Sequence, residues 1–121
     1  MLALRPVLPV TDMARSIAFW KGLGFKVVFC DSEPPEQADY AGVRGHGLEL
    51  HLQTFTPGQL SVTQVMNIRI ETSSREELER LHAAWSRQVD ISAPLEEKPW
   101  GTVEFGFRDP DGAPFHIYCD S

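Results

Sequence analysis

The chain of 121 residues has the size of one globular domain, with 42% hydrophobic residues, 23% charged residues and a net charge of −6. This composition excludes an intrinsically disordered chain, and no apolar run approaches the ~20 residues that span a bilayer. The acidic balance argues against nucleic acid as a partner. The first residues lack the pattern of a signal peptide, and Cys30 and Cys119 stand singly in apparent strands. We therefore expect a cytoplasmic protein with reduced thiols and no membrane partner.

The first half of the chain alternates between strand and helix signals. A strand at Leu4–Val10 leads to Asp12, whose carboxylate is suited to cap the helix that follows. Met13, Ile17 and Trp20 recur at helical spacing and predict its buried face. Further strands are expected at 25–30, 39–44 and 47–53, with an acid-rich loop at 31–39 and a turn at 45–47.

The second half repeats this order after a break at Thr56-Pro57-Gly58. A strand is expected at 62–71, and Ser74 with Glu77 three residues later has the spacing of a capping box. The helix that follows carries an apolar stripe of Leu78, Leu81 and Trp85, and a strand is expected at 89–93. The last element is a hairpin around residues 102–119, in which Asp109-Pro110-Asp111-Gly112 has the composition of a type I turn.

The order strand, helix and three strands therefore occurs twice. We predict an α+β fold, a single domain at 1–121 that consists of two pseudo-repeats, about 3–54 and 62–120.

Polar side chains recur on one face of several predicted strands. Period-two alternation places Leu48, Leu50 and Leu52 toward the helix, and the remaining polar residues share the other face. This set comprises Arg5, Glu49, His51, Gln53, Asn67, Arg69, His116 and Tyr118. A solvated outer face produces the same alternation, but the recurrence of His, Tyr and Arg favours a pocket.

Four stretches give the chain a family resemblance. They are Pro9-Val10-Thr11-Asp12 with Ala18-Phe19-Trp20 and Leu23-Gly24-Phe25, then Asp39-Tyr40-Ala41-Gly42-Val43, then Pro99-Trp100-Gly101 with Glu104-Phe105, and finally Arg108-Asp109-Pro110-Asp111-Gly112 with His116. Together they resemble the vicinal oxygen chelate superfamily (glyoxalase/bleomycin resistance/dioxygenase), and within it most closely the bleomycin resistance proteins. The resemblance implies paired βαβββ modules with curved mixed sheets that form a cleft, usually in a homodimer.

The enzymes of this superfamily bind a divalent metal through His, Gln or Glu at four strand positions. The resemblance places Arg5, Glu49, Asn67 and His116 there. A guanidinium remains protonated and is no metal ligand, so we expect no cofactor and no catalytic residue. The alternative is a metal-dependent glyoxalase or dioxygenase-like enzyme, with Glu49, His51 and His116 as the ligands.

The same resemblance implies a protein that sequesters a cationic aromatic glycopeptide-like ligand without turnover, which would confer antibiotic resistance. Trp100 and Tyr40 match aromatic residues of the resistance proteins, and the loop at 31–39 carries four acids and no base. His51 and Arg69 would also suit an anionic ligand, so the charge of the ligand stays open. The predicted ligand-binding residues are Tyr40, His51, Gln53, Asn67, Arg69, Trp100, Glu104, His116 and Tyr118.

Overall fold

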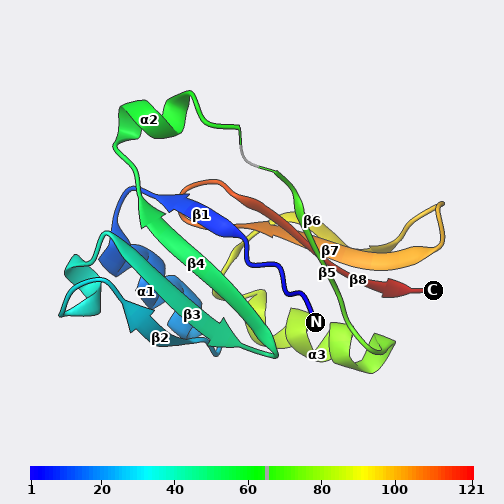
Figure 1. Cartoon of the computed structure of the whole chain (residues 1–121). Coiled ribbons are helices and arrows are strands. Elements are labelled where there is room, and N and C mark those ends of the chain that lie inside the picture. Colours follow the sequence, from blue (N-terminus) through cyan, green and yellow to red (C-terminus); the bar gives the residue numbers. More distant parts are fainter. Residues whose placement is uncertain (65) are drawn as a thin grey trace. The chain divides into compact units, whose positions relative to one another are not determined.

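The computed structural model describes residues 1–64 and 66–121, and the chain divides into two compact units (Figure 1). Unit 1 runs from Met1 to Gln64, and unit 2 is the rest of the chain. Each unit contains a four-stranded mixed sheet that does not close into a barrel, and a helix packed on it. The predicted α+β class and the repeated βαβββ order are confirmed.

Unit 1 contains the strands β1 (Val7–Val10), β2 (Lys26–Cys30), β3 (Tyr40–Gly45) and β4 (Leu48–Thr54). Its helices are α1 (Met13–Gly22), the 3₁₀ turn η1 (Pro35–Gln37) and the short α2 (Pro57–Ser61). The sheet order is β1-β4-β3-β2, with β1 parallel to β4 and the other pairs antiparallel.

The helix α1 begins and packs as its sequence predicts. The Asp12 carboxylate accepts a hydrogen bond from the backbone N–H of Arg15 at 3.1 Å. Met13, Ile17 and Trp20 are all buried, and the Trp20 ring meets Phe25 edge to face with centroids 5.0 Å apart. The remaining face of the sheet carries the polar side chains of β3 and β4.

The turn between β3 and β4 fixes which residues of the two strands lie opposite one another. His46 and Gly47 have φ of 55° and 78°, so both central residues are left-handed as in a type I′ turn. The register that follows places Arg44 opposite Glu49 and Gly42 opposite His51.

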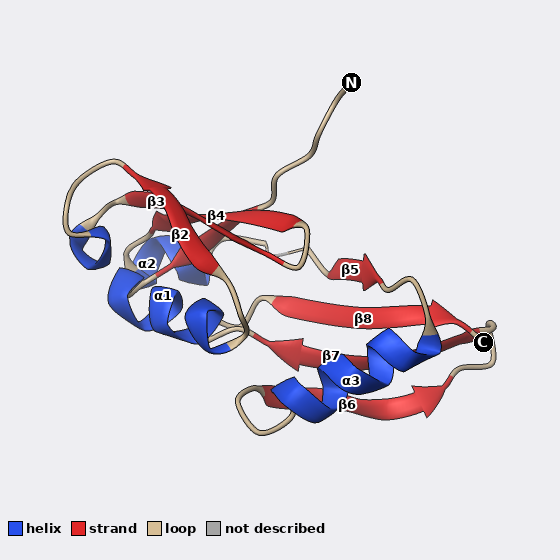
Figure 2. Ribbon diagram, turned by 90° about the horizontal axis from the view of Figure 1, so that it is seen from below, coloured by secondary structure: helices blue, strands red, loops and turns tan. Residues whose placement is uncertain are grey.

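Unit 2 repeats this plan with β5 (Ile68–Glu71), α3 (Arg75–Trp85), β6 (Asp90–Glu97), β7 (Thr102–Arg108) and β8 (Pro114–Asp120). The sheet order is β5-β8-β7-β6, and β5 is parallel to β8. The helix α3 packs on β7 and β8 (Figure 2). The Trp85 ring lies edge to face on Phe107, which stacks on Phe115 at a centroid distance of 5.1 Å.

The predicted turn of the last hairpin is present. The backbone N–H of Gly112 donates to the Asp109 carbonyl at 3.0 Å, which is the i to i+3 bond of a β-turn. The Asp109 carboxylate also accepts from the backbone N–H groups of Asp111 and Ala113. The Asp109 side chain therefore stabilises the backbone of this turn through two hydrogen bonds.

Several boundaries differ from the sequence predictions. The strand β1 begins at Val7, because Pro6 has no N–H to donate, although its carbonyl accepts from His51. Thr56 does not simply break the pattern: it caps α2 and forms a capping box with Gln59. Ser74 caps α3 as predicted, but the Glu77 carboxylate accepts from the backbone N–H of Ser73.

Two strand lengths also differ. The strand predicted at 62–71 is confined to Ile68–Glu71, and the part of that prediction at residue 65 lies outside the described residues. The strand predicted at 89–93 continues to Glu97, with irregular pairing to β7 along the way. In the described part of the chain, no helix has the length and apolar character needed to cross a membrane.

Candidate functional site

The polar face of unit 1 is organised around the carboxylate of Glu49. Its Oε1 accepts from the Arg44 guanidinium, with an Nε–Oε1 distance of 3.2 Å, and its Oε2 lies 3.3 Å from Arg5 Nε. Arg44 reaches Glu49 because the two residues are paired across β3 and β4. One carboxylate therefore serves two guanidinium groups.

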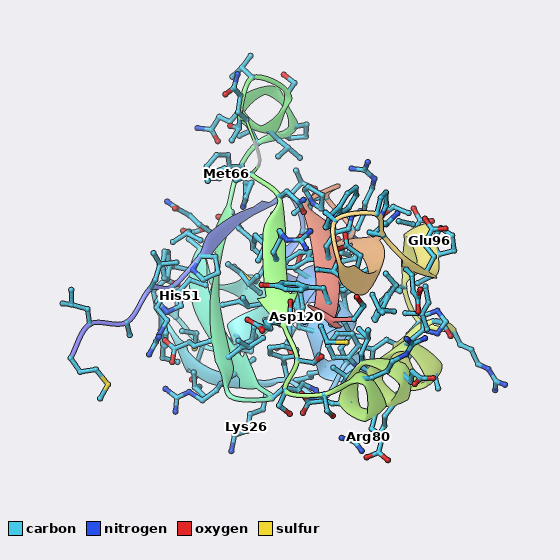
Figure 3. The ribbon with its side chains drawn as sticks, turned by 90° about the vertical axis from the view of Figure 1, so that its right-hand side faces the viewer. Lys26, His51, Met66, Arg80, Glu96 and Asp120 are labelled. Carbon is cyan, nitrogen blue, oxygen red and sulfur yellow. The ribbon has the colours of Figure 1, made fainter. Side chains whose placement is uncertain are left out.

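A chain of hydrogen bonds extends from this carboxylate along the sheet. His51 Nε2 lies 2.8 Å from Glu49 Oε2, and His51 Nδ1 lies 2.7 Å from the Tyr40 hydroxyl oxygen. Since a carboxylate only accepts, Nε2 carries the proton and donates it to Glu49, and in the neutral ring Nδ1 accepts from Tyr40. We call Arg5, Arg44, Glu49, His51 and Tyr40 the Glu49 cluster (Figure 3 labels His51).

These contacts shift the acidity of the carboxyl group. The hydrogen bond from His51, followed by that from Arg44 and the charge of Arg5, lowers the pKa of Glu49 to about 2. Glu49 is therefore ionised at neutral pH and holds its partners in place.

Phe29 belongs to this face, although the sequence analysis did not select it. The centroid of its ring lies 5.0 Å from that of the His51 ring. The Phe29 ring also stacks on Tyr40, with centroids 6.1 Å apart and an angle of 22° between the ring planes. A β-bulge between Val27 and Phe29 reverses the expected alternation, so that Phe29 pairs with Gly42. A side chain at Gly42 would collide with the Phe29 ring, which makes the glycine the signal for this contact.

The polar face of unit 2 has a different electrostatic arrangement. The Arg69 guanidinium donates two hydrogen bonds to the Glu104 carboxylate, at 3.2 and 2.9 Å, and lies 4.4 Å from the centre of the Tyr118 ring. The Thr102 hydroxyl donates to Glu104 Oε2 at 2.7 Å. We call Arg69, Thr102, Glu104 and Tyr118 the Glu104 cluster, in which one cation meets one carboxylate.

Glu104 is 3% exposed, and its pKa is lowered to about 2, chiefly by the hydrogen bonds from Arg69. Trp100 is a further, smaller cause of this lowered pKa, so its side chain lies near Glu104. Trp100 is 65% exposed, and Lys98 Nζ lies 5.7 Å from the centre of its ring.

His116 and Asn67 form the second polar contact of unit 2. His116 Nδ1 lies 2.9 Å from Asn67 Oδ1, and the His116 ring lies over Gly106, where a Cβ atom would come within 2.9 Å of Nε2. The sequence analysis listed both His116 and Asn67 among the polar residues of one face. Gln53, by contrast, is exposed on β4 opposite Tyr40 and has no role in either cluster.

The four positions that the resemblance assigns to a metal meet in two pairs, Arg5 with Glu49 and Asn67 with His116. Glu49 and His116 lie in β4 and β8, whereas Arg5 and Asn67 lie just before β1 and β5. The first pair does not fit a divalent metal, because Glu49 is already neutralised by guanidinium groups that cannot act as ligands. Within residues 1–64 and 66–121, no group of three or more His, Cys, Asp or Glu side chains is arranged to hold a metal ion.

The acid-rich loop of unit 1 is tied down by its own carboxylates. Asp31 accepts from the backbone N–H of Asp39, Glu33 accepts from the Cys30 thiol, and Asp39 accepts from the Thr54 hydroxyl. The loop leads directly into Tyr40, so its negative charges adjoin the Glu49 cluster along the chain.

The chain belongs to the Glyoxalase/Bleomycin resistance protein/Dioxygenase superfamily, whose family model matches residues 3–117. Among solved structures, it is similar to a bleomycin-binding protein from the bleomycin-producing Streptomyces verticillus, crystallised with copper(II)-bleomycin. The identity is 29%, the TM-score is 0.75, and the match covers 100% of this chain and 98% of that one.

Two further similar structures show the same fold. One is a bleomycin-binding protein in complex with bleomycin, with 18% identity, a TM-score of 0.77 and full coverage of both chains. The other is a lactoylglutathione lyase from Agrobacterium tumefaciens, with 14% identity, a TM-score of 0.71, and coverage of 98% of this chain and 92% of that one. No curated protein sequence matches this chain.

Proposed function

We propose that this protein binds and sequesters a small molecule, as bleomycin resistance proteins do, without catalysing its turnover. One observation carries this proposal: the Arg5 guanidinium is paired with Glu49, and Arg5 stands just before β1 at a position where the superfamily's enzymes would place a metal ligand. The 29% identity to a bleomycin-binding protein over nearly the full length of both chains supports the same conclusion. The proposed assembly is a cytoplasmic homodimer whose ligand lies in a cleft.

Aromatic side chains supply surfaces on which a planar ligand could stack. Tyr40 is partly exposed beside Phe29 in unit 1, and Trp100 is exposed in unit 2. A stacked aromatic pair contributes about 0.5–1.5 kcal/mol beyond the burial of its area, and a cation over such a ring adds a comparable amount. The proposed ligand is a cationic aromatic glycopeptide of the bleomycin kind.

The acid-rich loop would attract the cationic part of such a ligand. Its carboxylates are exposed or partly exposed, so their field is screened by salt over about 8–10 Å. We therefore propose that the loop carboxylates speed association and make affinity dependent on ionic strength; they belong to Asp31, Glu33, Glu36 and Asp39. The stacking residues would set the part of the affinity that salt leaves unchanged.

The second candidate is a metal-dependent lyase or dioxygenase. Glu49 and His51 would supply it with an oxygen and a nitrogen donor, but a metal would first have to displace their mutual hydrogen bond and the arginines on Glu49. Near-stoichiometric zinc, nickel, manganese or iron that survives dialysis would favour this enzyme over the binding protein.

A titration with metal-free bleomycin tests the proposed function. We expect quenching of tryptophan fluorescence in the parent protein, and calorimetry should show that Trp100→Ala weakens binding at low and high salt alike. Trp100→Phe, which keeps an aromatic surface, should restore most of the affinity. Absence of both quenching and heat of binding would contradict the assignment to bleomycin.

A further inference from the structure

The Glu49 cluster has more positive than negative groups. Glu49 uses Oε1 for Arg44, and it uses Oε2 for both Arg5 and His51. The side chains of Arg5 and Arg44 remain 41% and 57% exposed. A guanidinium has five N–H donors, so both arginines keep donors that Glu49 does not occupy.

This local excess of cations runs against the net charge of the molecule, which carries 11 Lys and Arg against 17 Asp and Glu. Arg69 has a carboxylate of its own in Glu104, with two parallel hydrogen bonds. Arg75 has two carboxylates, Glu79 and Glu97. Only on the face of unit 1, among these ion pairs, do two guanidiniums share one carboxylate.

A third cation extends the same row of the sheet. The antiparallel register pairs Lys26 of β2 with Arg44 of β3, and Arg44 in turn with Glu49 of β4. Directly paired residues of a sheet point to the same side, so Lys26 starts from the face that carries the cluster. Three cations and one carboxylate therefore share this end of the sheet.

An aromatic surface adjoins these cations. Phe29 is 40% exposed, although it is large and apolar, and its ring stacks on Tyr40 and meets His51 edge-on. His51 in turn bonds to Glu49, so the aromatic group and the guanidiniums are neighbours on one face. A ligand that satisfies both has a flat apolar body and an anionic head.

We propose that this face of unit 1 binds an aromatic carboxylate, whose oxygens accept hydrogen bonds from Arg5 and Arg44 while its ring lies against Phe29. Glu49 holds the two guanidiniums at a fixed separation and leaves their outer donors to the ligand. A carboxylate suits the planar donor pattern of a guanidinium. The site goes beyond the proposed sequestration, because it takes a group of opposite charge and is tested without bleomycin.

Benzoate is the probe, with benzyl alcohol as a neutral probe of nearly the same shape. In titrations of ¹⁵N-labelled full-length protein followed by NMR, we expect benzoate to shift amide signals of β3 and β4 and to bind more tightly than benzyl alcohol. Arg44→Gln should weaken benzoate binding at least about tenfold, as expected for loss of a charge-assisted hydrogen bond, and should leave benzyl alcohol unaffected. Arg5→Gln should act in the same direction.

Arg75→Gln is the matched control, because its guanidinium is 52% exposed but already has two carboxylates. It should leave benzoate binding unchanged. Equal binding of benzoate and benzyl alcohol, or equal effects of Arg44→Gln and Arg75→Gln, would overturn the proposal, as would shifts confined to unit 2. Thermal melting of each variant separates loss of binding from loss of folding. The bleomycin titration tests the proposed function separately, so failure of the benzoate site and failure of that function can be distinguished.

Discussion

Glu49 and Glu104 are two carboxylates with lowered pKa values and different surroundings. Glu104 is almost fully buried and belongs to one arginine, whereas Glu49 is shared between two arginines and a histidine. A carboxylate that belongs to one buried ion pair acts mainly on stability. When several exposed arginines share one carboxylate, their guanidinium groups keep N–H donors that are available for a ligand.

Replacing Glu104 by Gln should reduce the free energy of unfolding at pH 7 by about 2 kcal/mol, because the Arg69 and Thr102 hydrogen bonds lose their ionised acceptor. The pKa of Glu104 is lowered to about 2, so its stabilisation is complete above the ordinary value of 4.5 and is lost as the pH falls toward 2. Urea unfolding of parent and variant should therefore differ at pH 7 and converge near pH 2.

Glu97→Gln provides the control for this prediction. Glu97 pairs with Arg75 on the surface, where an ion pair is worth at most about 1 kcal/mol. A loss of stability as large as that of Glu104→Gln would show that the burial of Glu104 has no special effect.

Asp109 should respond to pH in the opposite direction. Burial raises its pKa from 3.8 to about 6, and its Oδ2 has no hydrogen-bond partner. The folded state then holds the proton more tightly than the unfolded state. The contribution of Asp109 to stability is therefore greatest below pH 3.8 and is lost as the pH rises through about 6, by about 3 kcal/mol in all.

Asp109→Asn tests this dependence, because the amide keeps an oxygen for the N–H groups of Asp111 and Ala113 but does not ionise. We expect the unfolding free energy of the parent, relative to the variant, to fall between pH 4 and pH 6. A constant difference over that range would contradict the raised pKa.

Alternation along the strands predicted most of the polar residues of both clusters, including His51, Glu49, Arg69 and Tyr118. It did not predict Phe29, because a β-bulge changes the face of a residue without changing the composition of the strand. It also did not predict that Arg44 shares Glu49, since that contact depends on the register set by the turn at His46 and Gly47.

At the scale of elements, the helices α1 and α3 each pack a buried tryptophan against their own sheet. Trp20 of α1 is 1% exposed and contacts Phe19 and Phe25. Trp20→Ala should therefore reduce the free energy of unfolding by about 3–5 kcal/mol. Trp100→Ala should change it by no more than about 0.5 kcal/mol, because Trp100 is 65% exposed. Chemical denaturation measures both, and a parent-like Trp20→Ala variant would contradict the packing of α1.

The long, periodic elements were the most predictable ones. The helices α1 and α3 carry both an N-cap and an apolar stripe, so two independent signals agree. The helix α2 has only five residues and no buried side chain, so it lacks a stripe, and only the Thr56 capping box marks it. Weak periodicity is also why β5 was predicted to be too long.

At the scale of the whole molecule, the two units repeat one topology with different chemistry on the polar face. Large apolar side chains are exposed in both units, among them Leu4, Val62, Met66 and Trp100. Such side chains favour association, so we predict a homodimer that buries at least the ~1,600 Å² of a standard interface. Light scattering at micromolar concentration should give twice the monomer mass, and a monomer would count against the prediction.

The central claim is that the protein binds its ligand without a metal of its own. Calorimetric titration with metal-free bleomycin, before and after exhaustive dialysis of the protein against a chelator, tests it most directly. The account predicts saturable binding of equal affinity in both preparations. It would be contradicted by binding that disappears with the chelator and returns with added zinc, nickel, manganese or iron, or by the absence of binding in either preparation.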